Sequence, residues 1–310
     1  MRITLEDAVR NARTIGYARR YPQPGDPRIR NGFVFPQMTP QFSFPAGATI
    51  FTLGSCFART VEENLAGFVV PTKTIAVPAG ERPGRSNGIL NEYNPGTMCQ
   101  RVEYAASGAS FGDQCIAPEG DGFLDLLLPE YVTPGTPQRL MQRRAEVDDV
   151  YRSLRSSEAI IVTLDLVEAW FDRETELYLN RLPPPGVLLT DRGRFELRIL
   201  DVDETQALLD RMVRTLVAMG VHKIILSVSP VSLEQTFSGR DCVVANSFSK
   251  SVLIACSNAI SHCYREVQYF PGYEIAIAAG ANSYEADHVH VRDDLVESIT
   301  KYLVDTYADM

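Results

Sequence analysis

The sequence places a serine early in the chain and an aspartate and a histidine near its end, the residue types of a nucleophile and its base. Ser55 follows an apolar β-type run at 50–54 and precedes a helix-like stretch. A strand that feeds such a turn puts the hydroxyl at the carboxyl edge of a parallel sheet, beside the free N–H groups of a helix. Asp287 and His290 lie three residues apart, so the carboxylate can orient the imidazole. We therefore predict a triad of Ser55, His290 and Asp287 for nucleophilic acyl transfer.

Neighbouring residues leave alternatives open. Cys56 is a competing nucleophile, because thiolates are stabilised at helix N-termini, but we expect a small buried side chain there. His288 becomes the base if the loop turns differently. A Gly-Ser pair after a strand is, taken alone, more often an ordinary helix N-cap. A metal enzyme that uses Asp287, His288 and His290 ranks lowest, and we predict no metal and no cofactor.

Several motifs accompany the serine turn in chain order: Gly54-Ser55-Cys56-Phe57-Ala58, Asn91-Glu92-Tyr93-Asn94, Thr163-Leu164, Ser229-Pro230-Val231, Ala245-Asn246 with Ser249-Lys250-Ser251, and Asp287 with His290. In this order the chain resembles the GSCFA-domain proteins, a bacterial family similar to the SGNH (GDSL-like) esterases and acyltransferases. The resemblance implies a flavodoxin-like α/β fold and a serine nucleophile. The chain departs from the family pattern at Val291, because a proline usually follows the histidine in the family.

The resemblance also suggests where an oxyanion would be stabilised. One donor is the backbone N–H of Ser55, and Gly88 and Asn91 resemble the glycine-bearing second block of the superfamily. Asn94 is an alternative to Asn91, and for either residue an Asx-type turn is an equal alternative. The asparagine that supplies a third donor in the related enzymes is absent here. Asp165 follows the central strand instead, and its carboxylate would repel an oxyanion unless it is protonated or turned away.

Further polar and aromatic residues are candidates for binding substrate or ordering the site: Glu168, Asn246, Ser249, Lys250, Trp170, Phe171 and Tyr178. The polar residues at 246–250 lie at the start of an expected helix, where such clusters usually cap the helix or face solvent. The aromatic residues suit a sugar-binding groove, although core packing is their more common role.

Composition limits the class of protein. With 310 residues, 45% hydrophobic and 22% charged residues, the chain suits one large α/β domain. The net charge of −9 argues against nucleic-acid binding, and we interpret Arg139, Arg143 and Arg144 as a solvated helix face. No apolar run reaches the roughly 20 residues of a membrane span, and the start has no hydrophobic signal core. We expect a cytoplasmic protein with reduced cysteines; the oligomeric state stays open.

Apolar runs and turn residues predict a three-layer α/β/α sandwich with a mostly parallel central sheet and with loop and β-rich insertions. The expected strands lie at 49–53, 68–70, 159–164, 223–228 and 267–270, and the expected helices at 1–20, 58–66, 98–106, 202–219, 246–265 and 293–307. Residues 1–48 form a helix and an extended arm, and residues 49–310 form the catalytic domain. Its insertions span about 73–148 and 170–200, the second with strands at 177–179, 186–190 and 195–199.

Together these features predict a serine-dependent acyl-ester hydrolase or O-acyltransferase that acts on O-acetyl groups of a carbohydrate or a similar polar substrate. The expected partner is a small-molecule or glycan acyl ester. Water as acceptor makes the protein an esterase, and a sugar hydroxyl makes it a transferase. The sequence does not separate these activities, because they differ in how well the closed site excludes water. The alternative is a non-catalytic ligand-binding protein, which the missing asparagine and Asp165 favour.

Overall fold

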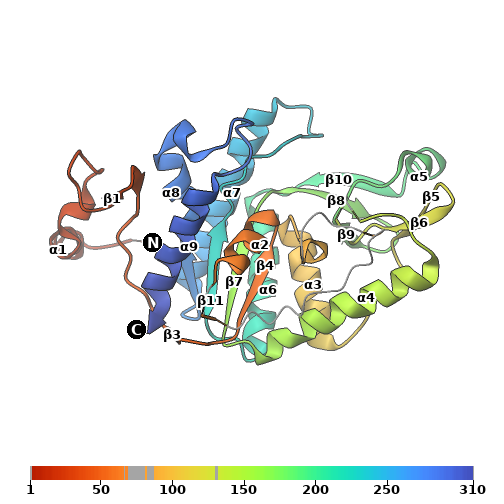
Figure 1. Ribbon diagram of the computed structural model, residues 1–310, viewed down its shortest axis with the longest axis horizontal. Coiled ribbons are helices and arrows are strands. Elements are labelled where there is room, and N and C mark those ends of the chain that lie inside the picture. The colour runs from red at the N-terminus through yellow and green to blue at the C-terminus, as the bar shows by residue number, and fades with distance from the viewer. Residues whose placement is uncertain (1, 66, 69–80, 82–86, 130–131, 310) are drawn as a thin grey trace.

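A parallel sheet of four strands forms the centre of the protein (Figure 1). The computed structural model describes residues 2–65, 67–68, 81, 87–129 and 132–309. The strands are β4 (Ile50–Gly54), β7 (Ala159–Leu164), β11 (Ile224–Val228) and β12 (Val267–Phe270), in the spatial order β12-β11-β7-β4. They are mostly apolar because both faces of the sheet are covered. Their carboxyl ends meet at one edge, where Gly54 lies opposite Thr163 and Val228 opposite Leu164.

Helices cover both faces of this sheet and confirm the predicted three layers. One face packs against α3 (Pro95–Ser107), α4 (Pro137–Arg152), α6 (Val202–Ala218) and α7 (Cys242–Cys263). The other packs against α2 (Cys56–Glu63), α8 (Gly272–Ala278) and α9 (Asp293–Tyr307). Alternation along each strand divides the core, so that Phe51 and Leu53 face the first layer and Ile50 the second. Short 3₁₀ turns lie at Gly16–Arg19 (η1), Gly88–Leu90 (η2), Ser153–Ser156 (η3) and Gly280–Ser283 (η4).

Helix α7 is long and apolar enough to span a membrane by length and composition, with 22 residues and a mean hydropathy of 1.2. In this structure it contributes Val252, Leu253, Cys256 and Ile260 to the core beneath the central sheet. It begins at Cys242, earlier than predicted, because the Asp241 side chain accepts a hydrogen bond from the Val243 N–H and caps the helix.

A second, smaller sheet stands at the carboxyl edge of the main one. In it, β8 (Glu168–Asp172) pairs antiparallel with β9 (Leu177–Leu179) and β10 (Phe195–Ile199). Strands β5 (Ile116–Glu119) and β6 (Gly122–Asp125) form a separate two-stranded sheet. The predicted strand at 186–190 is wrong: α5 (Pro185–Thr190) is a short helix there, since proline at the first helical position has its φ already set for a helix.

The amino-terminal residues form an arm. Helix α1 (Leu5–Thr14) buries none of its residues and lies away from the sheet (Figure 1). The predicted helix over 1–20 is shorter because Gly16 adopts a left-handed φ of 60°. Strands β1 (Ile29–Arg30) and β2 (Phe33–Val34) form a hairpin, and β3 (Phe44–Pro45) pairs with the final strand β13 (Ala308–Asp309). The strand predicted at 68–70 falls mostly on residues outside the described part of the chain.

The prediction of a solvated arginine face on α4 is wrong. Arg143 and Arg144 are buried, and Arg139 is only partly exposed. Arg144 forms a two-pronged ion pair with Asp125 at 2.6 and 2.7 Å, and Arg143 lies 2.9 Å from a carboxylate oxygen of Glu81. The physical reason is the position of α4, which lies between the central sheet and the hairpin of β5 and β6. Its arginines therefore hold the inserted segments onto the core.

Candidate active site

The turn between β4 and α2 brings the Gly54 backbone close to the neighbouring strand β7. Gly54 has a φ of +153°, and a Cβ atom at this position would lie 2.5 Å from the Thr163 carbonyl oxygen. Only glycine therefore allows β4 to end this close to β7. Ser55 then stands at the N-cap position of α2 in extended conformation.

The Ser55 hydroxyl does not cap the helix. Its side chain is 0% exposed, and its Oγ has no hydrogen-bond partner among the described residues. The ordinary reading of a Gly-Ser pair as a helix cap is therefore wrong here. A buried hydroxyl without a partner is costly, and such groups are rare enough in native proteins to require an explanation. A nucleophile held ready for a substrate is one.

A pocket of about 450 Å³ opens at the carboxyl edge of the central sheet, beside this turn. Of the residues singled out from the sequence, the structure brings the following to its wall: Cys56, Asn91, Asn94, Asp165, Glu168, Trp170, Lys250 and His290. The lining does not include Gly88, Asn246, Phe171, Tyr178, Asp287 or His288, and Ser55 lies one residue before Cys56 without reaching the surface. The expectation that Cys56 is buried is wrong, since it is partly exposed and lines the pocket.

Asp287 and His290 form the predicted pair. Asp287 Oδ2 lies 2.6 Å from His290 Nδ1, and Oδ1 accepts hydrogen bonds from the backbone N–H groups of Val289 and His290 at 2.9 and 3.0 Å. The hydrogen bond with His290, and then those with the two backbone groups, lower the pKa of Asp287 to about 2. With Nδ1 occupied by the carboxylate, Nε2 is the ring nitrogen left for proton transfer.

The loop that carries this pair turns at His288, whose φ of 58° is left-handed. The two following residues, Val289 and His290, line the pocket, whereas His288 does not. The His290 side chain is 60% exposed, and no hydrogen bond joins it to Ser55 among the described residues. In proteins without bound substrate such catalytic hydrogen bonds are often long and tighten only in the complex.

Asn91 is held in place opposite this loop. The next backbone N–H, that of Glu92, donates to the Gly54 carbonyl oxygen at 3.0 Å, and the Asn180 side chain donates to the Asn91 carbonyl oxygen. Asn94 has a different role, because its side-chain oxygen accepts from the Thr97 N–H and caps α3. The Asx-type alternative therefore holds for Asn94, and Asn91 is the better candidate for an oxyanion donor.

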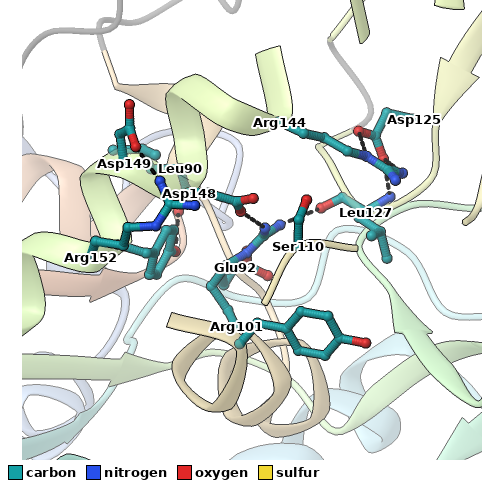
Figure 2. Close-up of polar contacts among 12 residues, drawn as sticks. Leu90, Glu92, Arg101, Ser110, Asp125, Leu127, Arg144, Asp148, Asp149 and Arg152 are labelled. Atoms are coloured by element: carbon teal, nitrogen blue, oxygen red, sulfur yellow. Dashed lines mark hydrogen bonds and ion pairs between the residues drawn. The ribbon is translucent and has the colours of Figure 1, made fainter. Parts of the chain in front are cut away.

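Glu92, the residue after Asn91, belongs to a buried group of charges, which we name the Arg101 cluster: Arg101, Glu92 and Asp148 (Figure 2). The Arg101 guanidinium lies 3.1 Å from Glu92 and 3.5 Å from Asp148, and it also donates to the Leu127 carbonyl oxygen at 3.3 Å. Burial raises the pKa of both carboxyl groups, although Arg101 acts in the opposite direction. This cluster was not predicted from the sequence. Glu92 lies within the motif Asn91-Glu92-Tyr93-Asn94, so the charged residue next to Asn91 was the feature that could have indicated it.

Asp165 is paired rather than free. Lys250 on α7 donates to the Asp165 carbonyl oxygen at 2.7 Å and to its carboxylate at 3.0 Å, and both side chains are largely buried. Beside them, the Ser249 hydroxyl accepts from the Val167 N–H at 2.9 Å. The interpretation of these α7 residues as a capping or solvated cluster is therefore wrong. The lysine offsets the negative charge that would otherwise oppose an oxyanion.

Glu168 and Asn246 hold the loop that follows β11. The Glu168 carboxylate accepts from the Thr236 hydroxyl and, at 3.1 Å, from the Phe237 N–H. The Asn246 side chain accepts from the Leu233 N–H at 3.0 Å. Both residues order the site, and only Glu168 reaches the pocket. Within the described ranges, no three histidine, cysteine or acidic side chains gather as a metal site would require.

Comparison with known proteins gives one family. The model of the GSCFA family matches residues 49–302, from the first residue before β4 into α9. A search of curated proteins finds no match.

Proposed function

The chain belongs to the GSCFA family, and from this premise and the site described above we propose that it is a serine-dependent acyl-ester hydrolase or O-acyltransferase with an SGNH-like triad. One observation carries the proposal. The Ser55 hydroxyl is buried at the start of α2 without a hydrogen-bond partner among the described residues, beside a pocket that His290 lines with its Nδ1 on Asp287. A nucleophile, a base and a group that orients the base are the parts that acyl transfer needs.

The proposed reaction proceeds in two steps. Ser55 Oγ attacks the acyl carbon while its proton passes to His290 Nε2, and the carbonyl electron pair moves onto oxygen. Collapse of this intermediate breaks the ester C–O bond, and the leaving alcohol takes the proton from His290. Water or a second hydroxyl compound then attacks the acyl-serine, gives its proton to His290, and leaves with the acyl group as Ser55 recovers its proton.

Two groups would stabilise the oxyanion. The backbone N–H of Ser55 is at the positive end of the α2 dipole, and the Asn91 side chain lies at the pocket wall in a segment fixed at both sides. Lys250 also lines the pocket, and its ion pair with Asp165 offsets the negative charge in the region where the related enzymes supply an asparagine. Fixed donors and charges in a site that excludes water contribute most to such catalysis.

A second candidate function is ligand binding without turnover. The observation that favours it is the absence of a hydrogen bond between Ser55 and His290 among the described residues, together with the complete burial of the Ser55 side chain. The two functions differ in whether Ser55 reacts with an electrophile.

The test is covalent labelling with a fluorophosphonate, followed by mass analysis of the peptide that contains Ser55. We expect label on Ser55 and turnover of nitrophenyl butyrate. Ser55→Ala should lose about 10⁴-fold or more in kcat, and Cys56→Ala should remain active. Label on Cys56, together with an inactive Cys56→Ala variant, would identify Cys56 rather than Ser55 as the nucleophile. A folded wild type without label or turnover would support ligand binding alone.

A further inference from the structure

Part of the pocket lining is built from apolar side chains of the second sheet and of the loop after β11. Trp170 on β8, Leu197 on β10 and Leu179 at the end of β9 come from the sheet, and Leu233 and Phe237 from the loop. The rings of Trp170 and Phe237 meet edge to face at 5.4 Å. This arrangement forms a continuous apolar wall.

Of the three acidic residues that line the pocket, Asp165, Glu168 and Glu234, the first two are engaged by the protein's own donors. Asp165 is ion-paired with Lys250, and both oxygens of the Glu168 carboxylate accept hydrogen bonds from the loop after β11. A sugar that lies along the apolar wall would give up hydrogen bonds to water without gaining these two carboxylates as partners, which opposes binding. An alkyl group loses no hydrogen bond and gains from leaving water.

The pocket is also larger than an acetyl group requires. A volume of about 450 Å³ corresponds to roughly fifteen water-sized groups. Sites of this size with a mostly apolar lining and a few placed polar groups are typical of small-molecule pockets. The polar groups beside which the ester would react are Asn91 and His290, and further polar side chains of the lining are Asn180, Arg181, Glu234 and Gln235.

We propose that the apolar wall binds a medium-chain acyl group, so that the substrate is an ester of an apolar acid longer than acetate. The inference rests on the proposed function, and it changes the acetyl group expected from the sequence. The acyl carbonyl lies beside Ser55 and His290, and the chain extends along Trp170, Leu197 and Phe237. Each methylene that enters the wall should strengthen binding about fourfold.

Trp170 makes the proposal testable without turnover, because it is the only tryptophan of the chain. The first experiment titrates folded Ser55→Ala protein with octanamide and, separately, with methyl glucoside, and follows tryptophan fluorescence. We expect a saturable change with octanamide and none with methyl glucoside. Phe237→Ser should weaken octanamide binding about tenfold or more. The matched control is Val244→Ser, since Val244 is exposed to a similar degree (57% against 47%) but does not line the pocket. Leu197→Asn is the second variant, in case Phe237→Ser disturbs its loop.

The second experiment measures wild-type kcat/KM on nitrophenyl acetate, butyrate, hexanoate and octanoate. We expect a rise of at least about tenfold from acetate to hexanoate, and a flattened series in Leu197→Asn. Saturable binding of methyl glucoside without binding of octanamide, or a preference for acetate over hexanoate, would overturn the proposal. If no ester is hydrolysed and yet octanamide binds, the acyl pocket stands and the proposed catalysis fails.

Discussion

The two walls of the pocket are built in opposite ways. On one side, Asn91 is next to Glu92 of the Arg101 cluster, in which every charge is buried and paired. On the other side, Asp287 and His290 stand on an exposed loop that turns through a left-handed residue. The first wall fixes donors for a developing charge, which requires that nothing reorganises during the reaction. The second must take and return a proton, and its imidazole and carboxylate are both partly exposed to solvent.

The same difference applies to stability. Exposed ion pairs contribute little, typically about 0–1 kcal/mol, because water and salt screen them. Removal of one member of a buried pair costs much more, since it leaves a charge without compensation. Changes on the loop should therefore alter rate with little effect on folding, and changes in the Arg101 cluster should alter folding first.

The largest expected effect is that of His290→Ala. It should reduce ester turnover about 10⁴-fold, comparable to loss of the nucleophile, because the base is removed. The melting temperature should change little, since the side chain is exposed. His288→Ala is the matched control on the same loop and should keep activity within about tenfold. Steady-state kinetics and melting curves of both proteins check this, and the reverse ranking would move the base to His288.

Arg101→Met should have the next largest effect, and on stability. Two buried carboxylates lose their partner, so the free energy of unfolding should fall by about 4 kcal/mol. Urea unfolding of the variant measures this. Glu92→Gln should cost clearly less, because Arg101 keeps Asp148 as a partner. An Arg101→Met protein as stable as wild type would show that the cluster adds no rigidity to the Asn91 wall.

The ion pair of Asp165 and Lys250 lines the pocket, but breaking it should lower stability, as breaking the Arg101 cluster should. Asp165→Gly leaves the lysine without its carboxylate and should lower stability by about 3 kcal/mol. It should not accelerate turnover, because Lys250 already offsets the negative charge. A double variant, Asp165→Asn with Lys250→Met, should recover part of the stability. Faster turnover by Asp165→Gly would mean that the carboxylate opposes the oxyanion despite its partner.

The smallest effect concerns the acid limb of the pH–rate profile. The folded-state pKa of Asp287 is lowered to about 2, so the carboxyl stays ionised from neutral pH down to about pH 3. Any stabilisation from this group is therefore complete above its unfolded pKa of about 3.9 and is lost as the pH falls through about 2. We therefore expect no proton on Asp287 to contribute to the kcat/KM profile between pH 4 and 8. A loss of activity in this range that vanishes when Asp287 is replaced by Asn would show that its carboxyl titrates there.

The sequence predicted the strands well because a buried parallel strand is an uninterrupted apolar run, and 159–164, 267–270 and the helix at 293–307 agree with the structure to the residue. It also placed Asp287 beside His290, since three residues on one loop are close by necessity. Pairs that are distant in sequence were not predictable. Asp165 and Lys250 are 85 residues apart, and only the packing of α7 on the loop after β7 brings them together. The buried arginines of α4 were misread because their carboxylate partners lie on other elements.

The exposure of Cys56 affects how the protein would respond to chemical probes. The thiol lines the pocket one residue after a serine that is itself hidden. An alkylating reagent on this sulfur would fill the space that a substrate needs and stop turnover without touching Ser55. In an inhibitor screen, such a protein would be classed as a thiol enzyme. Only a Cys56→Ala variant that is active and resists the alkylating reagent would distinguish this response from that of a true cysteine nucleophile.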